Sequence, residues 1–75
     1  MNSEKIIELI EAFAEANADL SRDQMTFANQ TPAGVENVPV VNAYVEQANY
    51  YGVRSMAANE LAELVRDLVA KENAA

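Results

Sequence analysis

The sequence predicts an all-α protein, a compact bundle of three main helices with a short fourth helix. Apolar residues recur at helical spacing in three separate stretches. A proline and a glycine mark a turn between residues 31 and 34. The chain of 75 residues is long enough for one domain only. We therefore treat residues 1–75 as a single helical domain.

The first predicted helix spans residues 4–20, and Asn2 or Ser3 is suited to cap its N-terminus. Its apolar stripe comprises Ile6, Leu9, Ile10, Phe13 and Leu20. Asn17 falls within the same arc, where a buried amide must be paired. It either specifies a helix register or a dimer, as a core Asn does in coiled coils, or bonds a loop carbonyl at the edge of the core.

The end of this helix is ambiguous. Ser21 followed by Gln24 fits a capping box, and Leu20 and Met25 stand where a hydrophobic staple would join them. Both patterns favour a new, short helix over residues 22–29. A spacing of seven favours instead one long helix with its apolar residues on one side; these are Ile6, Phe13, Leu20 and Phe27. We predict the break, and with it the short fourth helix.

Residues 31–34, Thr-Pro-Ala-Gly, suit a type I turn. Pro39 suits the first turn of the next helix, because its missing N–H costs nothing there. Apolar spacing places that helix at residues 38–51, although the valines at its start would also fit a short strand.

Gly52 is predicted to close that helix, and Ser55 to cap the last helix, over residues 56–72. A glycine between two helices resembles part of a DNA-reading helix-turn-helix. A recognition helix needs side chains that contact bases and cations that contact phosphates. Only Arg54 and Asn59 offer such groups here. We therefore predict a plain helix–helix corner at Gly52.

The composition excludes most catalytic and metal-binding chemistry. The chain has no cysteine and no histidine, which removes disulfides, thiolate metal sites and imidazole bases. Its two glycines are scattered and form no phosphate-binding loop. We predict no enzyme, and no catalytic, cofactor-binding or metal-binding residues.

The charge limits the partners. Twelve acidic residues against five basic ones give a net charge of −7, which repels nucleic acid and anionic membranes. No apolar run approaches the ~20 residues of a membrane span, and no signal peptide is visible. We expect no nucleic-acid partner, no membrane partner and a cytoplasmic location.

The first candidate surface for a partner is an acidic stripe on the first helix, where five carboxylates share an arc of about 80°. They are Glu4, Glu8, Glu11, Glu15 and Asp19. The stripe is either a solvated face or a surface that attracts a basic partner. It is too sparse to imitate DNA by itself, because one DNA strand carries a charge every ~3.4 Å.

The second candidate surface is polar, nearly uncharged and carries an aromatic side chain. It consists of Asn42, Glu46, Asn49 and Tyr50. Depleted charge beside an exposed tyrosine is typical of interface cores. In the intramolecular alternative, Tyr50 lies over the loop at residues 32–38. Met25 and Met56 are expected to fill the core.

These observations favour a non-catalytic protein–protein interaction module. It would be a small acidic adaptor or inhibitor that docks on a basic or mixed surface of a larger protein. The alternative is a self-assembling structural subunit, a homo-oligomer, because a core of this size is marginal alone. A helix-turn-helix-like nucleic-acid binder or a DNA mimic is the third and least favoured function.

Overall fold

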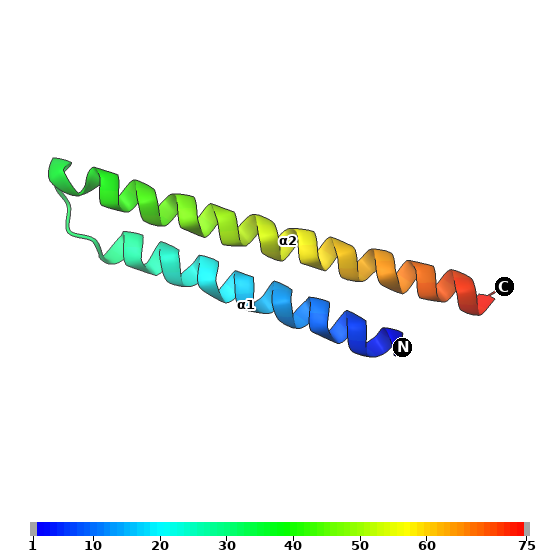
Figure 1. The fold of residues 1–75 in the computed structure, drawn as a ribbon. Coiled ribbons are helices and arrows are strands. Elements are labelled where there is room, and N and C mark those ends of the chain that lie inside the picture. The colour runs from blue at the N-terminus through cyan, green and yellow to red at the C-terminus, as the bar shows by residue number, and fades with distance from the viewer. Residues whose placement is uncertain (1, 75) are drawn as a thin grey trace.

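A computed structural model, which describes residues 2–74, shows two long antiparallel helices joined by a short loop (Figure 1). Helix α1 spans Ser3–Gln30, the 3-10 turn η1 spans Val35–Asn37, and helix α2 spans Val38–Ala74. The C-terminal end of α2 extends beyond the N-terminus of α1 (Figure 1). The predicted all-helical content is confirmed, and no strand occurs in residues 2–74.

The predicted compact bundle of three main helices and a short fourth helix is wrong. The molecule is a hairpin that measures 61 × 14 × 14 Å. Its radius of gyration is 17.4 Å, whereas a compact domain of this length has a radius of about 11 Å. Each predicted helix break is a position where a long helix continues without interruption.

The first of these positions is Ser21. It lies inside α1, so the helices predicted at 4–20 and 22–29 are one helix. The Ser21 hydroxyl does not cap a helix end; it donates a hydrogen bond of 2.7 Å to the backbone oxygen of Ala48 in α2. The capping pattern misled because serine is equally suited to a cap and to a close contact between two helices.

The second position is Gly52. It lies inside α2, so the helices predicted at 38–51 and 56–72 are one helix, and neither a corner nor a helix-turn-helix exists here. Ser55 does not cap a helix either, because its hydroxyl donates a hydrogen bond of 2.7 Å to the backbone oxygen of Ala14. Gly52 faces α1: a Cβ atom at this position would lie 3.5 Å from the hydroxyl oxygen of Ser21.

The two helices meet along a row of mostly small residues, which we call the seam. It comprises the buried residues Ile7, Ala14, Asn17 and Ala28 of α1 and Ala48, Ser55, Ala58 and Ala62 of α2. Their separations of three, four, seven and eleven residues are those of a heptad repeat. Small side chains allow the backbones to approach closely enough for a serine hydroxyl to reach the opposite carbonyl.

Local signals set the start of each helix and the loop between them as predicted. Asn2 caps α1, since its side-chain oxygen accepts hydrogen bonds from the backbone N–H groups of Glu4 and Lys5 at 3.0 and 3.4 Å. The chain reverses between the two helices, within the segment predicted to turn. There Gly34 has a φ of +152°, a conformation that side chains rarely adopt. Pro39 lies in the first turn of α2.

The two glycines provide a test of the uninterrupted α2. In a helix interior, Gly52→Ala should raise the free energy of unfolding by about 0.5–1 kcal/mol, because alanine has the higher helix propensity and the methyl group fits at van der Waals distance. Gly34→Ala should lower it by about 1–3 kcal/mol, because the positive φ strains any side chain. Urea unfolding followed by circular dichroism measures both. Destabilisation by Gly52→Ala would indicate a turn at this position.

Candidate interaction surface

The seam leaves the large apolar side chains outside. No large side chain among residues 2–74 is fully buried, and fourteen large apolar side chains in the same range are exposed. Nine of these fourteen lie along one side of the hairpin, at the heptad position next to the seam or at the one beyond it. We call this surface the apolar face. It comprises Leu9, Phe13, Leu20 and Phe27 of α1 and Val40, Tyr50, Leu61, Leu64 and Leu68 of α2.

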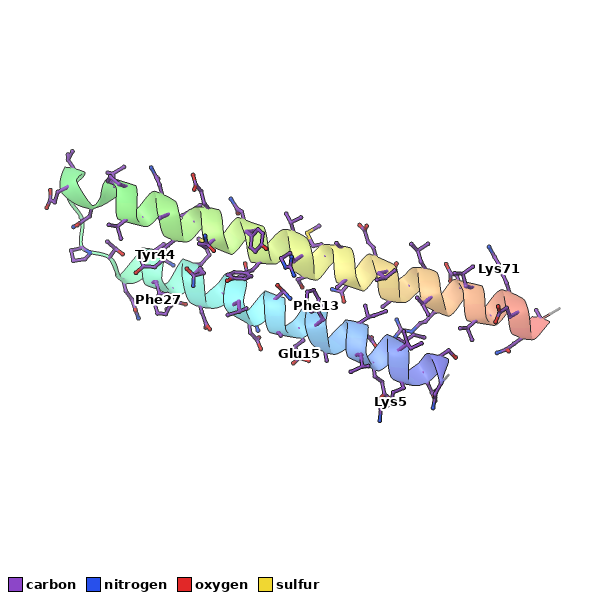
Figure 2. The ribbon with its side chains drawn as sticks, in the orientation of Figure 1. Lys5, Phe13, Glu15, Phe27, Tyr44 and Lys71 are labelled. Carbon is purple, nitrogen blue, oxygen red and sulfur yellow. The ribbon has the colours of Figure 1, made fainter. Side chains whose placement is uncertain are left out.

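Contacts between the helices agree with this placement for some of these residues. Near the loop, the Phe27 ring lies against the Tyr44 ring of α2, with 5.6 Å between the ring centroids (Figure 2). Further along, Leu9 and Phe13 of α1 and Leu61 of α2 line a common groove of about 490 Å³. The groove is completed by Ile10, Arg54, Ala57 and Ala58.

Arg54 is the cation at the middle of the apolar face, and aromatic rings hold it in place. Its guanidinium carbon lies 5.2 Å from the centroid of the Phe13 ring and 5.3 Å from that of Tyr50. One of its N–H groups also bonds the Tyr50 hydroxyl at 3.3 Å. Neither of the two ion pairs within residues 2–74 involves Arg54. Cation–π contacts therefore take the place of a carboxylate here.

Asn17 is buried in the seam and links the two helices. Its amide nitrogen donates to the Phe13 backbone oxygen at 2.8 Å, and its amide oxygen accepts from Nε of Arg54 at 3.3 Å. The alternative in which Asn17 bonds a loop carbonyl is wrong, because both of these partners lie within the helices. Both polar ends of the amide are satisfied, one of them by α2, so that Asn17 favours this alignment of the two helices.

The acidic stripe lies on the opposite side of the hairpin from the apolar face. Its Glu11 carboxylate pairs with the Arg66 guanidinium of α2 at 2.7 Å, and its Asp19 pairs with Arg22 one turn later. Glu15 points away from α2 (Figure 2). Arg22 and Arg66 lie outside the helix predicted at residues 4–20, and their positive charges offset part of the negative charge of the stripe. The heptad places Glu4 and Glu8 on the same side.

The second candidate surface is divided between two sides of α2. Tyr50 lies on the apolar face, in contact with Arg54. Asn42 and Asn49 share a heptad position with Met56 and Glu63. This position is next to that of Arg66 and therefore lies on the side of the acidic stripe. We call that side the polar flank. Glu46 points outward from α2, between the two sides.

Both methionines expected in the core are exposed instead. Met25 is 41% exposed and Met56 is 66% exposed. Met56 lies on the polar flank, and its exposure is similar to that of Leu64 on the apolar face, which is 59% exposed.

Residues 2–74 contain neither a cluster of metal ligands nor a membrane-spanning helix. No set of three acidic side chains in this range is arranged to hold a metal ion. In the same range, neither helix combines the length and the apolar character that a membrane-crossing segment needs. The apolar face and its groove therefore carry the case for a binding surface.

Comparisons with protein families, with curated proteins and with solved structures found no match to this chain.

The contact between Asn17 and Arg54 can be tested by a double-mutant cycle. Asn17→Ala and Arg54→Met should each destabilise the protein, and the two effects should be coupled by about 1 kcal/mol, because the buried amide oxygen of Asn17 loses its charged partner when Arg54 is replaced. Urea unfolding of the four proteins at one protein concentration measures the coupling. The exposed pair Glu11–Arg66 is the matched control, with an expected coupling below about 0.5 kcal/mol. Additive effects at Asn17 and Arg54 would contradict the contact.

Proposed function

We propose that the protein is a non-catalytic protein–protein interaction module that binds its partner by helix packing through the apolar face. The single observation that carries this proposal is the amount of surface left exposed. The chain exposes 5655 Å², whereas a compact folded protein of 8.2 kDa exposes about 4,500 Å². The excess of about 1,100 Å² is larger than one partner's share of a standard protein–protein interface, ~800 Å².

The composition of the apolar face also supports binding to protein. Exposed apolar patches on monomers rarely exceed about 300–600 Å², and here leucines, phenylalanines and a tyrosine extend along the hairpin. Arg54 and Tyr50 lie together at its middle. Arginine and tyrosine are enriched among the residues that dominate binding energy at interfaces.

The acidic stripe has a separate role in the proposal. It lies away from the apolar face, so its charges need not be desolvated when the face is covered. Charges outside a contact still change the rate of association and its dependence on salt. The stripe would thus steer the chain toward a basic or mixed surface, as an adaptor or inhibitor requires. A cytoplasmic location stays a prediction from the sequence.

The second candidate function is a self-assembling structural subunit. The same exposed face favours it, because the seam buries few large side chains and the hairpin gains a core only when the face is covered. Catalysis is not part of either proposal, since the chain has neither histidine nor cysteine.

Capture by a tagged chain tests the proposed surface. Leu64→Glu places a charge in the apolar face and should abolish capture of the partner, whether that partner is a larger protein or a differently tagged copy of the chain. Met56→Glu adds the same charge on the polar flank, at a similarly exposed position, and should capture what the wild type captures. Quantitative mass spectrometry of the bound proteins measures both. Equal capture by the two variants would contradict the proposal.

A further inference from the structure

We infer that the partner on the apolar face is a second copy of this chain, so that two hairpins form a four-helix dimer. This inference rests on the proposed function and names the occupant of the proposed surface. It commits the face to one partner, and three properties of the chain support that choice: the area left exposed, the distribution of charge, and the lack of a core within one hairpin.

The exposed area matches what a stable dimer buries. If each chain covered its excess of about 1,100 Å², the dimer would bury about 2,200 Å² in total, which falls within the range of ~2,000–5,000 Å² found for obligate homodimers. The hairpin is 61 Å long and 14 Å wide, so one side of it provides an area of the same order as the excess of one chain. Two copies of the same side also match one another in length.

The charges leave only this side open to a second copy. Each chain has a net charge of −7, and two copies therefore repel one another over most of their surface. The acids of the stripe and Glu63 lie on the polar flank, and three more point outward from α2: Glu46, Glu60 and Asp67. By heptad position, the one acid on the apolar face is Asp23, and the cation Arg54 offsets it.

A single hairpin also lacks the core that would hold it folded. Its buried apolar residues are one isoleucine and five alanines within residues 2–74. Packing two apolar faces together would enclose Leu61, Leu64 and Leu68 of each chain between four helices, as in a helical bundle. A second copy is present wherever the chain is made, so folding and pairing can occur together. Arg54 fits such an interface, since its guanidinium already lies on two rings.

Analytical ultracentrifugation of the full chain, from about 1 to 200 µM, tests the dimer. The wild type should sediment at twice the chain mass of 8.2 kDa. Leu64→Glu should raise the dimer dissociation constant at least about 100-fold, because it buries an unpaired charge. Met56→Glu should change it less than about threefold, as expected for an exposed position outside the contact. A wild type that sediments as one chain, or as three or more, overturns the inference.

Leu64→Glu also removes apolar area and thus acts on folding as well as on pairing, so a second measurement uses the wild type alone. Isotope-labelled and unlabelled chains are mixed, and nuclear Overhauser effects between chains are recorded. They should involve the methyl groups of Leu61, Leu64 and Leu68 and not that of Met56. Contacts between chains that map to Met56 instead overturn the inference.

The outcomes separate this inference from the proposed function. A wild type that stays monomeric, yet captures a different protein through Leu64, overturns the second copy as partner and leaves the interaction module standing. If the wild type is monomeric and Leu64→Glu captures the same proteins as the wild type, both the second copy as partner and the interaction module are overturned.

Discussion

The close approach of two long helices is the constraint on which the rest of the structure depends. Ser21 and Ser55 each donate a hydrogen bond to a backbone oxygen of the opposite helix, and these bonds form only where the helices nearly touch. Five alanines, Ile7 and Asn17 fill the remaining buried positions of the seam. Apart from Ile7, no large apolar side chain within residues 2–74 is buried there, and most of them lie at flanking heptad positions and face outward. The apolar face is thus a direct consequence of the narrow seam.

The same geometry separates charge from apolar surface. The helix positions on one side of the seam carry the acidic stripe, and those on the other side carry leucine and phenylalanine. Where the two helices meet, single polar residues connect them: Arg66 pairs with Glu11 on the polar flank, and Arg54 bonds Asn17 at the apolar face. The hairpin therefore has one side that attracts cations and one side that gains by being covered, and we propose that the second is where its partner binds.

Local signals in the sequence predicted the start of α1, the loop and the start of α2 correctly, but those inside each helix predicted breaks that do not exist. Asn2 and the segment Thr31–Gly34 act within a few residues, so their roles follow from the residues alone. Ser21, Gly52 and Ser55 have roles that depend on a helix about thirty to forty residues away. No rule for caps and turns distinguishes a serine at a helix end from one that faces another backbone. The spacing of seven from Ile6 to Phe27 did indicate an uninterrupted α1, and it also marks the apolar face.

The dependence of thermal stability on protein concentration tests the central claim, that a hairpin with so narrow a seam requires a second copy to cover its apolar face. Circular dichroism at concentrations spanning a hundredfold range gives the midpoint of unfolding at each. If folding is coupled to pairing, mass action raises the midpoint as the concentration increases. A midpoint that is the same at every concentration, with fully helical signal at the lowest, would mean that one hairpin is stable alone, and would contradict the claim.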